Sequence, residues 1–265
     1  MPGWLVPPAG PGVCRVCHGP ARDGRPVCWC CRTVGAALAG AVVPRVVPVA
    51  LFRPGDPMHR TLRRYKDAPS VAARRHHVAT LTGILDRFLV AHEACLRGNG
   101  GGWDTVTVVP STRGRSCEAG SRRPGLRVRN PLEAVVDACR TFAGVSRLRL
   151  VLGAATVGHL RPSSDAFVVD GDCGGRRVLV LDDTWTTGAH ARSAAAAVSR
   201  AGATVAGILV IGRAVDPRAA VGVGEWWDRT VARQARDIAT EPGPDPAAAW
   251  GSLGAGRCCL EPECR

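Results

Sequence analysis

Residues 175–189 constrain the fold more than any other part of this chain. They read GRRVLVLDDTWTTGA, with four apolar residues, then two acids, then a turn of small residues. A short continuous apolar run of this kind is typical of a strand buried on both faces in a parallel sheet. The alanine-rich residues 189–201, followed directly by Gly202, predict a helix and its end. We therefore expect a buried strand that ends in two carboxylates and turns into a helix.

This strand–turn–helix pattern predicts a binding site for a sugar phosphate. The first N–H groups of a helix are unpaired and lie at the positive end of its dipole, which favours a phosphate. Thr186 and Thr187 add hydroxyl donors, and Gly188 lets the backbone approach a phosphate closely. Asp182 and Asp183 would repel that phosphate unless they accept hydrogen bonds from sugar hydroxyls or hold Mg²⁺ through water. The alternative is that the two acids only cap a helix.

Strand and helix patterns alternate around this motif. Strands are expected over residues 105–110, 149–152, 178–181 and 204–211, and helices over residues 131–142, 189–201 and 218–238. Such alternation with short connections predicts an α/β fold, a parallel β-sheet flanked by helices on both faces. Ligands of these sheets bind beyond the carboxyl ends of the strands. Trp226 and Trp227, in the last helix, are expected to pack in the core.

Composition divides the chain into four regions. Residues 12–33 hold five of the twelve cysteines and form a small N-terminal module. Residues 34–102 form a basic connecting and helical region, and residues 103–239 form the α/β domain. Residues 240–265 are rich in proline, glycine and alanine, so we expect a disordered tail.

The cysteines of the N-terminal module have the spacing of a structural zinc site, Cys14-x2-Cys17-x10-Cys28-x2-Cys31. So short a segment cannot bury a core, so the metal would supply its folding energy. Four thiolates leave no open position on the ion, which argues against a catalytic role. Cys30 competes with its neighbours, so the exact ligand set stays open, and His18 is expected to be a bystander. For the three cysteines of the tail we favour no second site: Cys258, Cys259 and Cys264.

The charge of the chain is +13, and it is concentrated at the N-terminal end. Residues 1–100 carry +9, and Lys66 is the only lysine in the whole sequence. Arginine suits bidentate contacts to phosphate, so a nucleic acid is a candidate partner. Within the basic region, which also predicts a strand over 46–52 and a helix over 71–96, the candidate contacts are Arg63, Arg64, Lys66, Arg74 and Arg75. The alternative for that cluster is a solvated helix face.

The N-terminal residues lack the basic and apolar pattern of a signal peptide. The most apolar stretch, residues 34–52, is interrupted by Arg45 and by two prolines, so we expect no membrane span. A cytoplasmic location follows as the expectation, and there cysteines bind metals or stay free more often than they form disulfides.

The acidic pair followed by Thr-Thr-Gly resembles the phosphoribosyl pyrophosphate signature of the type I phosphoribosyltransferases. That resemblance implies that Asp182 and Asp183 are catalytic and contact the ribose hydroxyls. It assigns the 5′-phosphate and the adjoining ligand contacts to Thr184, Thr186, Thr187, Gly188, Ala189 and His190. His190 stands where the family usually has threonine. The loop after the strand over 105–110 corresponds to the pyrophosphate loop, with Ser111, Arg113 and Arg115 as contacts, and residues 152–167 match the loop that covers the site.

A cysteine module ahead of such a domain is similar to the ComF/GntX family, and Arg64-Tyr65-Lys66-Asp67 looks like the Tyr-Lys segment of that family. The resemblance covers roughly residues 14–215. It implies a protein that binds phosphoribosyl pyrophosphate or a ribose 5-phosphate ligand with Mg²⁺, carries structural Zn²⁺, and is linked to competence and DNA uptake in bacteria.

Three functions follow from these patterns. The first is a phosphoribosyltransferase. The second is a catalytically inactive protein that binds DNA, with single-stranded DNA as partner, in which the ligand is regulatory or structural. A glutamine amidotransferase is the weakest, because it needs an N-terminal nucleophilic cysteine and the first cysteine, Cys14, belongs to the zinc pattern.

Overall fold

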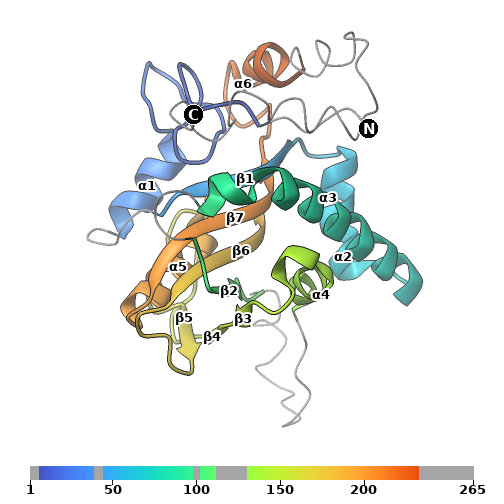
Figure 1. Ribbon diagram of the computed structural model, residues 1–265. Helices are drawn as coiled ribbons and strands as arrows, with labels where there is room; N and C mark the ends of the chain where they lie inside the picture. Colours follow the sequence, from blue (N-terminus) through green and yellow to red (C-terminus); the bar gives the residue numbers. More distant parts are fainter. Residues whose placement is uncertain (1–5, 39–43, 98–101, 112–129, 233–265) are drawn as a thin grey trace, which may run out of the picture.

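A five-stranded parallel sheet forms the centre of the computed structural model, which describes residues 6–38, 44–97, 102–111 and 130–232 (Figure 1). Its strand order is β1-β7-β6-β2-β3, and every neighbouring pair is parallel. The strands are β1 (Val46–Phe52), β2 (Thr105–Val108), β3 (Ser146–Arg147), β6 (Arg177–Trp185) and β7 (Thr204–Ala214). The predicted α/β class with a parallel sheet is confirmed.

Helices cover both faces of this sheet. α2 (Pro57–Asp67), α3 (Val71–Arg97) and α4 (Pro131–Ala138) pack on one face, and α5 (Ala189–Arg200) packs on the other. Side chains alternate along β6, as strand geometry requires. Leu179 and Leu181 join the cluster under α3 and α4, whereas Val178 and Val180 join the cluster under α5.

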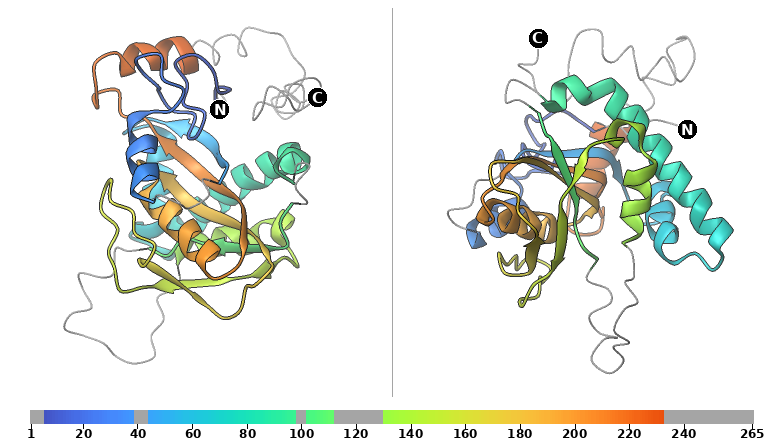
Figure 2. Two further views of the ribbon diagram at one scale, coloured as in Figure 1. Left: turned by 90° about the vertical axis from the view of Figure 1, so that its left-hand side faces the viewer. Right: turned by 60° about the horizontal axis from the view of Figure 1, so that its bottom comes forward.

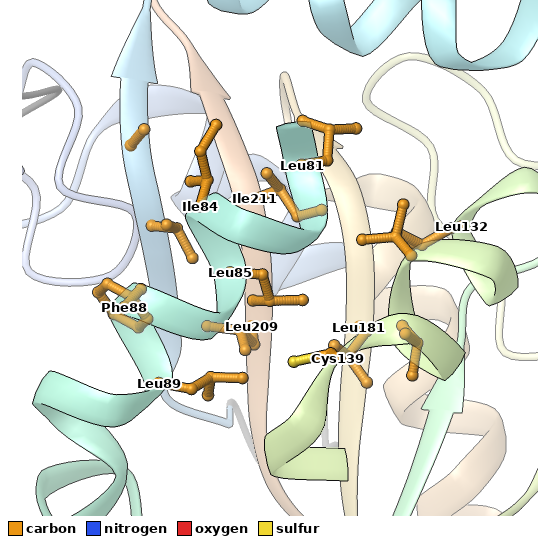
Figure 3. Close-up of a cluster of buried hydrophobic side chains, with 14 of the residues drawn as sticks. Leu81, Ile84, Leu85, Phe88, Leu89, Leu132, Cys139, Leu181, Leu209 and Ile211 are labelled. Atoms are coloured by element: carbon orange, nitrogen blue, oxygen red, sulfur yellow. The ribbon is translucent and has the colours of Figure 1, made fainter. Parts of the chain in front are cut away.

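The core between α3, α4 and the sheet is built from large aliphatic side chains (Figure 3). Leu81, Leu85 and Leu89 of α3 are fully buried, and they face Leu209 of β7 and its neighbours. At about 25 cal/mol for each Å² of apolar surface, burial of this layer is a main source of stability. The layer makes the sheet a rigid support for the loops at its edges.

Most predicted elements are present, with shifted ends. The strand over 46–52 and the helices over 71–96 and 189–201 correspond to β1, α3 and α5. The strand over 178–181 continues through both acids to Trp185, and the strand over 204–211 continues to Ala214. The helix over 131–142 stops at Ala138 and is followed by a 3₁₀ helix (Arg140–Phe142).

Two elements differ from the prediction. β4 (Arg149–Leu152) does not join the parallel sheet; it pairs antiparallel with β5 (Phe167–Asp170) in a separate two-stranded sheet. The last helix begins only at Val223, as α6 (Val223–Trp227), and continues as a π-helical turn (Asp228–Ala232) to the end of the described segment. The predicted burial of Trp226 and Trp227 is confirmed.

The cysteine module, with α1 (Trp29–Ala37), lies next to α6 in the views of Figures 1 and 2. Trp226 joins the two segments, because its Nε1 donates a hydrogen bond to the carbonyl of Gly12 at 2.7 Å. The basic region, residues 34–102, supplies the edge strand β1 as well as α2 and α3. Within the described parts of the chain, no helix combines the length and apolarity that a membrane crossing requires.

Candidate ligand site and metal centre

The turn between β6 and α5 is built around Gly188 and Trp185. Gly188 is the N-cap of α5 and has φ 85°, a left-handed conformation that favours glycine. A Cβ atom at this position would also lie 2.1 Å from Cζ2 of Trp185. The indole is buried and packs against Gly188 of the turn. Trp185 is therefore a packing residue of the turn.

Contacts with residues 153–166 fix the rest of the turn. The hydroxyl of Thr187 donates to the carbonyl of His159, and Ser193 of α5 accepts the N–H of Ser163 at 2.9 Å. Thr187 is buried, whereas Thr186 is exposed and His190 is half-buried. The segment that the resemblance assigned to a covering loop thus lies against the turn. Thr186 is thus exposed beside the start of α5, whereas Ala189, Ala191 and Arg192 of the first turn of α5 are buried.

Asp183, the second acid of the pair, is held by α2. Tyr65 donates a hydrogen bond to Oδ2 of Asp183 at 2.7 Å, and Lys66 forms an ion pair with the same oxygen. Tyr65 and Asp183 are both buried. From the sequence, Lys66 is predicted to contact nucleic acid, and Tyr65 has no predicted site role. The Tyr-Lys segment of the resemblance was the signal that marked these residues.

Asp182 lies half-buried beside this pair, and its carboxylate accepts the N–H of Asp183 at 2.9 Å. Burial and the neighbouring charge of Asp183 raise the pKa of Asp182 to about 8, and Lys66 opposes that rise. The two acids therefore differ: the raised pKa favours the protonated form of Asp182 near neutral pH, whereas Asp183 forms the ion pair with Lys66. A protonated carboxyl group donates hydrogen bonds, and a bound cation would displace its proton.

A cavity of about 300 Å³ opens next to the acidic pair. It is lined by Phe52, His59, Leu62, Arg63, Lys66 and Thr184. His59 stacks on Phe52, with ring centroids 5.9 Å apart. The volume is at the lower end of the range for small-molecule pockets. The lining combines an aromatic wall with two cationic side chains, and Thr184 and Lys66 connect it to the acids.

The candidate pyrophosphate loop begins at the same edge of the sheet. Val109 donates a hydrogen bond to the carbonyl of Leu181 at 2.9 Å, which places the end of β2 beside the end of β6. Ser111 follows two residues later and is exposed. Arg113 and Arg115 lie outside the described residues.

The four cysteines of the zinc pattern form one buried cluster. The sulfur atoms of Cys14, Cys17, Cys28 and Cys31 all lie within 4.8 Å of one another. The sulfurs of Cys17 and Cys28 are 3.8 Å apart, about the separation expected around a tetrahedral ion with 2.3 Å metal–sulfur bonds. The N–H groups of Val16 and Cys28 donate to the sulfur of Cys14 at 3.4 and 3.3 Å. These donors and spacings fit a structural metal ion such as zinc.

Cys30 and His18 lie outside this cluster. Cys30 is half-buried, and its sulfur is not among the four that lie within 4.8 Å of one another. Nδ1 of His18 is within 2.8 Å of the carbonyl of Pro7, a backbone hydrogen bond. The cluster of described residues thus contains Cys28 and Cys31 and excludes Cys30. The three tail cysteines lie outside the described residues.

Four of the five candidate nucleic-acid contacts are exposed at the turn between α2 and α3: Arg63, Arg64, Arg74 and Arg75. The fifth, Lys66, points toward Asp183 instead. Neither a protein-family model nor a curated protein matches this chain.

Proposed function

We propose that this chain binds phosphoribosyl pyrophosphate, or a ribose 5-phosphate ligand, as a type I phosphoribosyltransferase-like protein of the ComF/GntX family. The supporting observation is the arrangement at the end of β6. Two acids are followed by a left-handed glycine turn onto the first turn of α5, at one edge of the sheet. The positive end of the helix dipole at the start of α5 favours an anion, and the carboxylates can accept hydrogen bonds from sugar hydroxyls.

In this proposal, different residues at this edge of the sheet bind different parts of the ligand. The backbone between Thr186 and His190 holds the 5′-phosphate, and Asp182 contacts the ribose hydroxyls. Tyr65 and Lys66 hold Asp183 in place. Ser111 begins the loop for the pyrophosphate. Mg²⁺, held by the acids through water, would neutralise charge on that group.

If the protein is an enzyme, the reaction is transfer of the phosphoribosyl group with departure of pyrophosphate. The negative charge of Asp183 then stabilises the oxocarbenium-like ribose, as electrostatic catalysis requires. The cavity beside Thr184 is the place for an acceptor, because it adjoins the acids and is large enough for a small molecule.

Calorimetric titration of metal-loaded protein with phosphoribosyl pyrophosphate and Mg²⁺ tests this proposal. We expect binding by the natural sequence and a loss of at least tenfold in affinity for Asp182→Asn. The matched control is Asp170→Asn, because Asp170 is an acid of β5 that pairs with Arg149 away from the turn. Absence of heat from folded protein would refute the ligand assignment.

A second candidate function is binding of single-stranded DNA. The observation that favours it is the four exposed arginines at the turn between α2 and α3. They concentrate positive charge on one part of the surface, as phosphate-backbone contacts require. In that case the sugar-phosphate ligand would be regulatory or structural.

A further inference from the structure

Two buried arginines lie between the cysteine cluster and the ligand turn. Arg192 comes from α5, one turn after Gly188, and Arg213 comes from β7. They are 4% and 7% exposed. Burial of a guanidinium group is costly unless something compensates its charge, so these side chains require an explanation.

Arg192 connects α5 with the last cysteine of the cluster. Its Nη1 donates a hydrogen bond to the carbonyl of Cys31 at 2.9 Å. The same guanidinium lies over the ring of Trp185, with Cζ 6.0 Å from the ring centroid. A Cβ atom on Gly35 would lie 3.0 Å from Nη1, so α1 approaches this arginine closely.

Arg213 makes the same connection from the sheet. Its Nη1 donates to the carbonyl of Trp185 at 3.4 Å and also to the carbonyl of Ala214. On its other side the guanidinium interacts with Cys17. A Cβ atom on Gly19, two residues after Cys17, would lie 2.9 Å from Nη2. The cysteine module thus packs directly against the guanidinium group of Arg213.

Both arginines contact Trp185, and the ring of Trp185 packs against Gly188 in the turn. Its ring leaves no room for a side chain at Gly188, so a displaced ring would change the shape of the turn. Within the described part of the chain, Nε of Arg192, Nε of Arg213 and Nε1 of Trp185 are buried without a hydrogen-bond partner. Unpaired groups of this kind are unfavourable, so the buried positive charge of the two arginines requires a compensating interaction.

The negative charge of a metal-loaded cysteine cluster would compensate the positive charge of the two arginines. Four thiolates around a divalent ion carry a net charge of −2, which two guanidinium groups offset. Arg192 reaches the carbonyl of Cys31 and Arg213 packs against Gly19, and both also contact Trp185. A change in the cysteine cluster therefore reaches the atoms that support Trp185.

We propose that Arg192 and Arg213 are positioning residues that couple metal binding at the cysteine cluster to the shape of the ligand turn. The cysteine module then acts as a metal-dependent support of the ligand site. The coupling is reciprocal: a ligand that orders the turn tightens metal binding by the factor by which the metal tightens ligand binding. Of these statements, only the effect of the ligand on metal binding rests on the proposed function.

Zinc affinity, measured by chelator competition, is the first test. Arg192→Met and Arg213→Met remove the charge and keep an unbranched apolar side chain. We expect each to weaken zinc binding by about tenfold or more, as with partners of metal ligands in general. Arg200→Met is the control, because Arg200 lies on α5 but is exposed and pairs with Asp165. Equal zinc affinity in all variants would overturn the proposal.

Hydrogen exchange of the backbone amides of residues 184–191 is the second test, with residues 81–89 of α3 as the internal reference. In the natural sequence, zinc removal should speed exchange in the turn at least tenfold and leave α3 unchanged. The methionine variants should exchange rapidly in the turn even with zinc bound. An unchanged turn, or an equal loss of protection in α3, would overturn the proposal.

Two additions separate the possible failures. Where a methionine variant does not fold, Arg192→Lys or Arg213→Lys keeps the charge but loses the planar fork, and the turn should still lose protection. Phosphoribosyl pyrophosphate with Mg²⁺ should raise zinc affinity in the natural sequence. If that ligand does not bind at all, the proposed function fails, while zinc affinity and hydrogen exchange still decide the coupling.

Discussion

The acidic pair at the end of β6 consists of two chemically different carboxyl groups. Asp183 is held by a hydrogen bond from Tyr65 and an ion pair with Lys66, whereas burial and the charge of Asp183 raise the pKa of Asp182. Adjacent acids differ in this way because strand geometry points successive side chains to opposite faces of a sheet. One carboxyl group is thus held by α2, and beside it lies one whose raised pKa favours the protonated form.

The raised pKa of Asp182 predicts a specific dependence of stability on pH. The folded protein holds this proton between the unperturbed pKa of 3.8 and the folded pKa of about 8. The stability contribution of this group is therefore complete below pH 4 and is lost as the pH rises through 8. Asp182→Asn mimics the protonated acid, so it removes this loss.

Denaturant unfolding of metal-loaded protein at pH 6 and pH 8.5 checks this prediction. Relative to the natural sequence, Asp182→Asn should gain roughly 2–3 kcal/mol in unfolding free energy between the two pH values. Parallel changes in both proteins would show that Asp182 ionises normally.

Gly188 carries the second prediction at the residue scale. Gly188→Ala puts a Cβ in a left-handed conformation and into the ring of Trp185. We expect a loss of roughly 2–5 kcal/mol in stability from backbone strain and overpacking together, and loss of ligand binding. Thermal unfolding and calorimetry measure the two effects.

The matched control for this variant is Gly222→Ala. Gly222 has φ 80° and is also the N-cap of a helix, but a Cβ there meets nothing within 4 Å. Only the backbone cost of about 1–2 kcal/mol should appear. Equal losses in the two variants would mean that contact with Trp185 does not shape the turn.

At the scale of elements, local patterns predict the fold well where they are strong. The apolar run and acids of β6 are sufficient to predict a strand, a turn and a helix. Helix α2 was missed because Pro57 and the arginines dominate its composition, although Met58, Leu62 and Tyr65 have helical spacing and are buried. Strand β4 was predicted, but four residues do not say which sheet they join.

Local sequence patterns do not predict contacts between distant segments of the chain. Tyr65 and Asp183 are separated by 118 positions in the chain, and each has an ordinary local explanation, core packing for the tyrosine and helix capping for the acid. Similarly, Arg192 and Arg213 look like surface arginines in the sequence. Only the packing of α2, β7 and the cysteine module reveals what these side chains do.

The cysteine module gives a prediction at this scale. Cys31→Ser removes one of the four clustered sulfurs, so metal content should fall from about one ion per chain to a small fraction of that, and the melting temperature should fall. Cys30→Ser is the matched control, because Cys30 is adjacent but outside the cluster. Elemental analysis and thermal unfolding check both. Metal loss in Cys30→Ser would mean that the ligand set includes this residue.

At the scale of the whole molecule, the fold joins regions that composition separates. Residues 34–102 are basic and read as a connection, yet β1 pairs along its length with β7 at one side of the parallel sheet. Asp183 of β6 contacts Tyr65 and Lys66 of α2, which belongs to this same region. The sheet edge proposed to bind the ligand and the basic surface are therefore parts of one body, so an anionic partner on α2 and α3 would lie close to the proposed ligand site.

The charge distribution predicts binding of single-stranded DNA that weakens steeply with salt. Positive charge is concentrated in residues 1–100, which carry +9 of the net +13. Arg63, Arg64, Arg74 and Arg75 are exposed there. Each phosphate contact contributes about −0.7 to the slope of log affinity against log salt on a single strand. Replacement of all four by glutamine should reduce the slope by roughly 3.

A fluorescent oligonucleotide titrated at several salt concentrations measures this slope. The control variant is Arg147→Gln with Arg149→Gln and Arg200→Gln, because these exposed arginines already pair with acids. It should bind almost as the natural sequence does. Binding that is absent, or insensitive to salt, would refute the nucleic-acid hypothesis. Equal losses in both variants would mean that the net charge, and not the turn between α2 and α3, attracts DNA.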